Sequence, residues 1–244
     1  MCKICENNYD DNLTNLYLNE CKKINEIQLL PNLQELYCNN TKIKEIPNLH
    51  NLQFLDCRNT EIKEMPILPN LQILYCSGIK IKEIPILPNL QELYCNNTKI
   101  KEIPILPNLH TLWCNKTKIK EIPILPNLQD LWCDNTKLRK IPFLSNLRIL
   151  NCSDTKIKEI PILYNLQFLN CENTEIREIP TLPNLQELNC LNTKIKEIPI
   201  LPNLHRLWCD LGYYCNKEEI QIFYKQQNLK RRLLHLWKIY KLKN

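Results

Sequence analysis

The chain has 244 residues, with 32 Lys and Arg against 26 Asp and Glu, and a formal net charge of +6. No stretch approaches the roughly 18 consecutive apolar residues of a membrane-spanning helix. The first residues also lack the apolar run of a signal peptide. We therefore expect a protein without a transmembrane segment, in a reducing cytoplasmic compartment.

Residues 1–12 precede the first regular pattern and are predicted to form an N-terminal cap segment. Cys2 and Cys5 form a Cys-x-x-Cys pair here. No second pair or His cluster follows at a zinc-ligand spacing. We therefore expect neither a metal nor a cofactor.

A 19-residue period then dominates residues 13–212. Ten cysteines recur at this spacing from Cys38 to Cys209, in step with leucine columns that begin at Leu33 and Leu36. A fixed period of this length indicates a stack of similar structural units rather than one globular core. The strand leucines, Leu13 followed by Leu33 and its equivalents, predict an array of eleven strands over residues 13–212.

Within each unit, two local patterns predict a strand and an extended return segment. Leu36 and Cys38 alternate with Glu35 and Tyr37, as in a strand with one buried face. Pro47 recurs in every later full unit, and a second Pro follows three residues on in most of them. Prolines at this spacing oppose a helix and favour extended or polyproline II backbone. The expected fold class is a β-rich solenoid with parallel strands on its concave face.

The consensus Leu-x-x-Leu-x-Cys-x-x-Thr-x-Ile-x-x-Ile-Pro resembles the leucine-rich repeat, with Cys38 and its equivalents in the third leucine position. Thr41 and its equivalents stand where the family has an Asn that ladders between coils. The short Pro-containing return is similar to the repeats of bacterial effector proteins, and the Asn, Lys and Ile-rich composition is similar to leucine-rich repeat proteins of giant viruses. The resemblance implies a non-enzymatic module that binds a protein partner on its concave face.

A ubiquitin-ligase effector is an alternative that this resemblance raises. Such effectors carry a separate catalytic domain after the repeats, whereas only about 32 residues follow Gly212 here, fewer than a domain needs. Cys152-Ser153-Asp154 has the spelling of a ligase motif, but Cys152 belongs to the periodic inward column, and a buried apolar thiol is inert. Parallel side chains on neighbouring strands also suit a disulfide poorly. We therefore expect free thiols and no enzyme.

The exposed strand positions form three columns in which acids outnumber bases eight to two. This balance disfavours nucleic acid on the concave face and favours a basic or mixed protein surface. Aromatic residues follow one another on four adjacent strands, either as a binding hot spot or as a stabilising cross-strand ladder. We expect a monomer whose candidate partner-binding residues are Tyr37, Phe54, Tyr75, Glu92, Tyr94, Trp113, Asp130, Trp132, Asp134 and Trp208.

On the return segments, a basic column that begins at Lys44 runs beside a Glu column that begins at Glu45, in which Lys140 is the one exception. We interpret these two columns as a solvated, charge-compensated face.

Residues 213–244 carry the excess positive charge and predict a basic helix. Asn216 is a candidate N-cap with Glu219 three residues on. Ile222, Leu229, Leu233, Leu236 with Trp237, and Tyr240 fall on one helical face. A cap over the last coil is one interpretation. The alternative is an electrostatic tether in which this helix binds anionic membrane, nucleic acid or calmodulin and the repeats act as a spacer.

Overall fold

The structure is a computed structural model that describes the chain except residues 1–9, 11, 211, 215 and 244. Cys2, Cys5 and most of the predicted segment 1–12 therefore lie outside the described residues.

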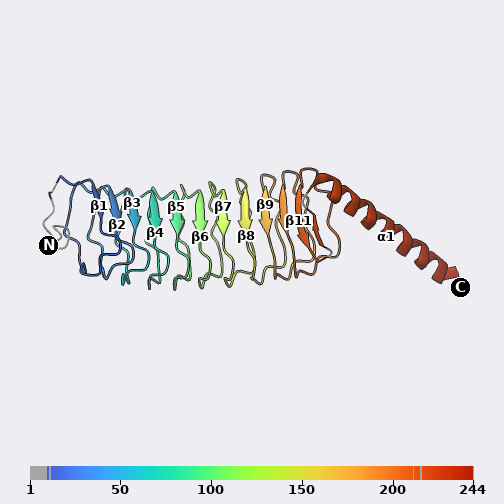
Figure 1. Ribbon diagram of the computed structural model, residues 1–244, viewed down its shortest axis with the longest axis horizontal. Helices are drawn as coiled ribbons and strands as arrows, with labels where there is room; N and C mark the ends of the chain where they lie inside the picture. Colours follow the sequence, from blue (N-terminus) through green and yellow to red (C-terminus); the bar gives the residue numbers. More distant parts are fainter. Residues whose placement is uncertain (1–9, 11, 211, 215, 244) are drawn as a thin grey trace.

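Within the described residues, twelve short strands form one sheet in chain order, followed by one helix (Figure 1). Strands β1 to β11 pair in parallel, each with the next, and β12 pairs antiparallel with β11. The elements are β1 Asn15–Tyr17, β2 Glu35–Tyr37, β3 Phe54–Asp56, β4 Ile73–Tyr75, β5 Glu92–Tyr94, β6 Thr111–Trp113, β7 Asp130–Trp132, β8 Ile149–Asn151, β9 Phe168–Asn170, β10 Glu187–Asn189, β11 Arg206–Cys209, β12 Gly212–Tyr214 and α1 Lys217–Lys243.

This arrangement confirms the predicted fold class, a parallel-strand β-solenoid followed by a single C-terminal helix. From β2 to β10 each strand residue pairs with the residue 19 positions on, as Leu93 does with Leu112. Within the described part of the chain, the segments between these strands contain no helix. The prolines account for this, because they remove backbone N–H donors and restrict φ.

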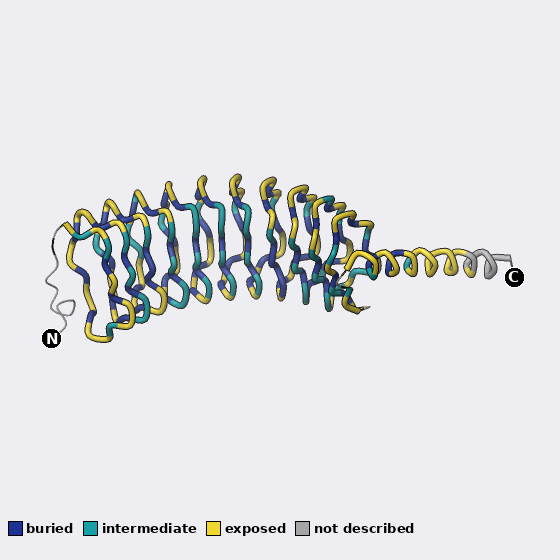
Figure 2. The backbone as a smooth tube through the Cα atoms, turned by 45° about the horizontal axis from the view of Figure 1, so that its top comes forward, coloured by how far each residue is buried: buried dark blue, intermediate teal, exposed yellow. Residues whose placement is uncertain are grey.

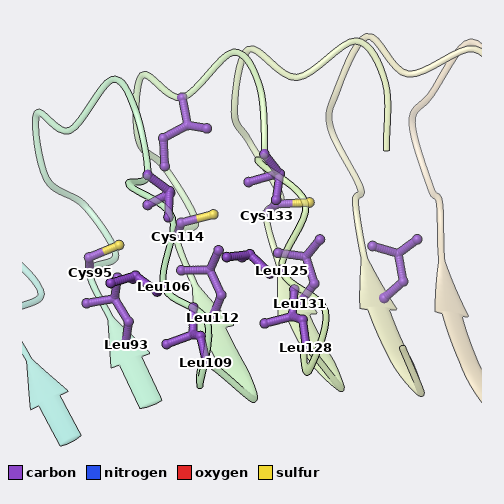
Figure 3. Packing of buried hydrophobic residues seen from close by; sticks show 14 of the residues in the cluster. Leu93, Cys95, Leu106, Leu109, Leu112, Cys114, Leu125, Leu128, Leu131 and Cys133 are labelled. Atoms are coloured by element: carbon purple, nitrogen blue, oxygen red, sulfur yellow. The ribbon is translucent and has the colours of Figure 1, made fainter. Parts of the chain in front are cut away.

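The core is a continuous column of Leu, Ile and Cys side chains inside the coils (Figure 3). Leu106, Leu109, Leu112 and Cys114 come from a single unit, and all four are fully buried. Buried and exposed residues alternate around every coil (Figure 2). The ten periodic cysteines are buried, and the nine from Cys38 to Cys190 carry free thiols, as predicted. Each therefore acts as a small apolar residue.

Two hydrogen-bond patterns fix the coils. In the turn after the strand, the hydroxyl of Thr98 donates to the carbonyl of Cys95 in the same coil at 2.8 Å, and Thr does likewise in the other coils from β2 to β10 except that of β4, where Ile79 stands at this position. The link between coils comes instead from the Asn that precedes the first leucine. Asn108, for example, donates from its side-chain amide to the carbonyl of Pro88 on the preceding coil at 2.9 Å. The Thr that replaces the family's Asn thus stabilises the turn rather than the stack.

The turn also requires a left-handed residue. Asn97 has φ of 55° and Gly78 has φ of 77°, and Asn, Asp or Gly fills this position in almost every unit from β2 to β10. Lys116, with φ of 56°, is the exception. Asn and Gly are preferred because a positive φ costs less without a bulky side chain.

Helix α1 begins on the last coil and then projects beyond the array (Figures 1 and 2). The side-chain oxygen of Asn216 accepts a hydrogen bond from the backbone N–H of Glu219 at 2.9 Å, which confirms the predicted N-cap. Ile220, Phe223 and Tyr224 are buried against the core. The apolar face identified from the sequence is therefore not the packed face. Ile222, Leu229, Leu233 and Trp237 are all more than half exposed, and the side chains of Leu236 and Tyr240 lie outside the described part.

Candidate functional site on the strand face

We call the surface formed by the outward side chains of β1 to β11 the strand face. All ten candidate residues lie on it and are half-buried, nine within strands and Asp134 just after β7. Trp208 on β11 is separated from the others by β8 to β10. It stacks instead on Tyr213 of β12, with ring centroids 5.1 Å apart.

Eight aromatic rings form one ladder across β1 to β9, longer than the four-residue run that the sequence predicts. Tyr75 and Tyr94 stack at 4.3 Å between centroids, Tyr94 meets Trp113 edge-on at 5.1 Å, and Trp113 lies 5.2 Å from Trp132. The members in order are Tyr17, Tyr37, Phe54, Tyr75, Tyr94, Trp113, Trp132 and Phe168.

The ladder continues past two strands whose central residue is not aromatic, because rings from the neighbouring column take over. At β3 and β8 the central position holds Asp56 and Asn151, which the sequence analysis places among the exposed columns but which are buried at 3% and 6% exposure. Phe54 bridges the gap at β3. Phe168 lies 6.3 Å from Trp132 across β8. Sequence reasoning missed Tyr17, which extends the central column by one strand before Tyr37, and Phe168, which stands in the same adjacent column as Phe54.

Two acids of the strand face are held by tyrosines of the same strand. The hydroxyl of Tyr37 donates to Glu35 at 3.1 Å, and that of Tyr94 donates to Glu92 at 2.8 Å. Burial and the neighbouring carboxylate raise the pKa of both tyrosines. The phenols therefore stay protonated and act as donors that orient the carboxylates.

The acid on β3 has a cationic partner of its own. Arg58 donates to both Asp56 carboxylate oxygens, at 2.9 and 2.8 Å, and its guanidinium lies 5.2 Å from the ring centroid of Tyr75. Burial raises the pKa of Asp56, but hydrogen bonds from Arg58 and Asn39 outweigh it, so the pKa is lowered. A guanidinium on an aromatic and acidic surface is thus already accommodated at this end of the ladder.

The acid on β7 is in a different situation. Burial raises the pKa of Asp130, and the indole N–H groups of Trp113 and Trp132 lower it in part. Neither indole reaches hydrogen-bond geometry, so both Nε1 atoms and Asp130 Oδ1 are buried without hydrogen-bond partners, as is Oδ1 of Asn115. Two donors and two acceptors are therefore unsatisfied within one small area of the aromatic ladder.

Asp134 lies beside this cluster and is better satisfied. Its Oδ1 accepts from the side-chain amides of Asn115 and Asn151. Burial raises its pKa as well. The strand face over β6 and β7 therefore combines flat indole surface with two carboxylates whose ionised forms are disfavoured by burial.

The structure also shows an apolar stripe that the sequence analysis missed. On the return segments, the residue after the first proline of most units is a large apolar side chain that is about half or more exposed: Ile67, Ile86, Ile105, Ile124, Phe143, Ile162 and Ile200. Single exposed apolar residues are ordinary, but one in nearly every coil makes a continuous stripe. The signal was the recurrence of this position with the same 19-residue period.

Among the described residues, no three His, Cys, Asp or Glu side chains gather as potential metal ligands. In the same part of the chain, no helix has the length and apolarity needed to cross a membrane.

These features define a solenoid repeat protein with an aromatic and acidic strand face. The sequence matches the family described as Leucine Rich repeats (2 copies) at residues 31–70, 50–88, 69–108, 88–124, 107–146 and 145–184. The chain therefore belongs to the leucine-rich repeat family. Proteins of this family generally act as non-enzymatic interaction scaffolds, and no catalytic domain is evident in the described part of the chain.

Solved structures of bacterial proteins share the fold. A leucine-rich repeat protein of Leptospira interrogans is 27% identical, with a TM-score of 0.69 over 76% of this chain and 56% of that one. The functional domain of InlJ from Listeria monocytogenes, which includes a cysteine ladder, is 24% identical, with a TM-score of 0.71 over 81% and 53%. YopM from Yersinia enterocolitica is 22% identical, with a TM-score of 0.65 over 76% and 53%.

The chain thus spans about half the length of these proteins. No curated protein sequence matches it. The two likenesses below 25% identity show the fold alone.

Proposed function

We propose that this protein is a non-enzymatic interaction module that holds a protein partner against its strand face, centred on Trp113 and Trp132. The observation that carries the proposal is the group of four buried polar atoms without hydrogen-bond partners on Trp113, Asn115, Asp130 and Trp132. Leaving such atoms unpaired is costly. A partner that turns these side chains outward on binding and supplies hydrogen bonds to them recovers this cost.

The surroundings support the same centre. Tyr75, Tyr94, Trp113 and Trp132 are rigid, half-buried rings, and Trp and Tyr dominate the binding energy of protein interfaces. Ring stacking alone accounts for part of the ladder, but it gives no reason to leave the indole N–H groups unpaired. The acidic excess of the strand columns favours a partner with a basic or mixed surface over a nucleic acid.

The test compares wild type with the double variant Trp113→Ala/Trp132→Ala. Proteins captured in the native cell by proximity labelling are purified, and their affinity for both chains is measured. We expect the double variant to weaken binding by at least about 2 kcal/mol while keeping the circular dichroism spectrum of the array. Tyr17→Ala is the matched control, because Tyr17 belongs to the same ladder at its exposed end. Unchanged affinity of a folded double variant would refute the proposal.

A second candidate function uses the projecting part of α1. Residues 220–244 contain seven Lys and Arg and no Asp or Glu. The exposed residues Ile222, Leu229 and Leu233 fall together on a side of the helix that differs from the side of Phe223 and Tyr224, which pack on the array. A basic amphipathic helix with an exposed apolar face is typical of a tether to an anionic surface. Deleting residues 233–244 tests it, because the tether then loses its target while the strand face stays intact.

Compartment and origin complete the proposal. Unbridged cysteines in nine consecutive coils, from Cys38 to Cys190, suit a reducing compartment such as the cytoplasm. The resemblance of the composition to giant-virus repeat proteins and that of the Pro-containing return to bacterial effector repeats stay predictions, and so does the monomeric state.

A further inference from the structure

The exposed charges of the array are divided between its two sides. The strand columns hold eight acids, of which only Asp56 is buried, and two bases, whereas the three return columns that begin at Lys42, Lys44 and Glu45 hold 17 bases and 10 acids. The residues of these return columns are exposed in nearly every coil. The Lys44 and Glu45 columns compensate each other as predicted, but the Lys42 column makes the return side basic.

This basic side has one local maximum. The Glu45 column contains Glu in eight of its nine coils and Lys in the ninth, at Lys140. Lys137 and Arg139 occupy the other two columns of the same coil, so this coil presents three cations and no acid. Every other coil presents at least one acid at these positions.

Lys140 lies in a groove between neighbouring coils. The groove has a volume of about 930 Å³, and its charged lining consists of Lys120, Glu121, Lys137, Arg139, Lys140 and Lys156. A groove of about 990 Å³ near the N-terminal end of the array is lined by Lys44, Glu45, Glu61, Lys63, Glu64 and Lys80. The two grooves are similar in size, but the first has five bases and one acid and the second has three of each. Charge, rather than shape, distinguishes the Lys140 groove.

No cation that lines the Lys140 groove forms an ion pair within the described residues, although Glu121 lines the same groove and Glu159 and Glu175 line the adjoining one. Within the described residues, the ion pairs of the return side involve Lys158 or Lys194 with Glu175, and Arg231 with Glu197. The groove is nevertheless preformed. The backbone N–H of Lys137 donates to Ile119 at 3.1 Å, and that of Lys156 donates to Leu138 at 3.3 Å, which ties three coils together beneath the side chains.

We propose that this groove, built around Lys137, Arg139 and Lys140, binds a compact anion that carries two or more phosphate groups. Lys is a mobile point charge suited to phosphate oxygens, and Arg adds a planar fork for bidentate contact. The cations come from three consecutive coils, a span of roughly 10 Å at the strand spacing of a sheet. That span matches neighbouring phosphates on one small molecule or head group better than a long polymer. The site lies on the return side and does not depend on the proposed function of the strand face.

The first test restores the residue that the other coils carry. Isothermal titration with inorganic tripolyphosphate compares wild type with Lys140→Glu. We expect the dissociation constant to rise by about tenfold or more, because one attraction becomes a repulsion at close range. Lys63→Glu in the balanced groove makes the same change in net charge and should leave this affinity unchanged. Equal affinities for wild type and Lys140→Glu, with both chains melting at the same temperature, would overturn the proposal.

The second test rebuilds the proposed phosphate site in a different coil. Glu102→Lys, made in the Lys140→Glu background, adds a third cation to the coil that already presents Lys99 and Lys101. The coils on either side of this one carry Lys, Lys and Glu at the three column positions, the same residues that flank Lys140. We expect tripolyphosphate binding to return with one site per chain. A relocated triad that stays folded and does not bind would contradict the proposal.

Two further arms identify the source of the phosphates. Flotation with phosphatidylcholine vesicles that contain phosphatidylinositol bisphosphate reports a lipid head group if wild type binds and Lys140→Glu does not. Tripolyphosphate binding without vesicle binding supports a free anion. Capture of polyglutamate without any binding of tripolyphosphate would show an acidic-peptide surface and overturn the phosphate assignment.

Discussion

The hydroxyl of Tyr224 on α1 accepts a hydrogen bond from the backbone N–H of Leu201 at 3.2 Å, in the last full return segment. Two more bonds, between the side-chain amide of Gln227 and the backbone of Ile198, continue the contact along the helix. Arg231 pairs with Glu197 one turn further on. The array is thus covered by the first half of the helix.

We predict different outcomes for two truncations of this helix. Deleting residues 217–244 uncovers the last coil by removing Ile220, Phe223 and Tyr224, each of which contributes roughly 1.5–3 kcal/mol when buried. The shortened chain should aggregate or melt many degrees lower. Deleting residues 233–244 keeps every contact named above and should leave the melting temperature within a few degrees. Light-scattering and thermal unfolding distinguish the outcomes. Equal stability of the two truncated chains would show that the helix is not a cap.

Lys116→Asn should stabilise the array. Lys116 has φ of 56° at a position where the equivalent coils carry Asn, Asp or Gly, and Asn tolerates this conformation better than Lys. We expect a gain of roughly 0.5–1 kcal/mol in the free energy of unfolding. Urea titration measures it, with Lys118→Asn as the control at an exposed site without positive φ. A loss of stability in Lys116→Asn would contradict this account of the turn.

Thr98→Val should be destabilising although it keeps the shape of the side chain. The buried hydroxyl of Thr98 donates to the carbonyl of Cys95 at 2.8 Å, and its removal leaves this carbonyl acceptor without the bond. The expected cost is about 1–1.5 kcal/mol in urea unfolding. Thr181→Val, at an exposed return position, should change stability by less than about 0.5 kcal/mol. Similar values for both variants would show that the turn bond is not important.

The periodic thiols should resist alkylation. Burial raises the pKa of Cys95 and of Cys152 to about 12. The reactive thiolate is therefore scarce at pH 8, and burial excludes the reagent as well. Peptide mapping after iodoacetamide treatment at pH 8 should show these two cysteines unmodified in the folded protein and modified in urea. Rapid labelling of the native protein would refute the buried register of the column.

The ionised carboxylate of Asp130 should reduce stability at neutral pH. Burial raises its pKa in the folded protein above the unfolded value, so the folded state binds the proton more tightly. The penalty is complete above the folded pKa and disappears as the pH falls below the unfolded value, near 4. Asp130→Asn should therefore be more stable than wild type at pH 7, and the difference should shrink towards pH 3. If the stability difference between Asp130→Asn and wild type instead grew on acidification, its pH dependence would have the opposite sign and this explanation would be excluded.

The repeat array could be predicted from the sequence because the same residue types recur at the same positions in every unit. Leu36, Cys38 and their equivalents alternate with polar or aromatic residues in every unit, so one register satisfies all coils. The free state of the cysteines followed from the same register. These residues could point to the other face of the sheet only if the register of every coil shifted together.

The irregular parts were less predictable because they depend on particular contacts. After Cys209 the period ends, and β12 forms where the chain turns back on β11. The helix packs through Phe223 and Tyr224, which are buried, and Tyr224 accepts a hydrogen bond from Leu201, although the other face has more leucines. On the strand face, Asp56 is buried because Arg58 pairs with it, and Phe54 then carries the ladder past it. The alternation of inward and outward positions in the sequence does not by itself predict an ion pair such as that of Arg58 with Asp56.

The identical pairing of each coil with the next has an evolutionary consequence. Each strand from β2 to β10 meets its neighbour through residues 19 positions apart, so removing or copying one whole unit creates no new kind of core contact. Unequal recombination between the near-identical gene segments can therefore lengthen or shorten the array in single-coil steps. Each step also adds or removes one set of outward residues. The length of the array and the set of residues on its strand face therefore change together.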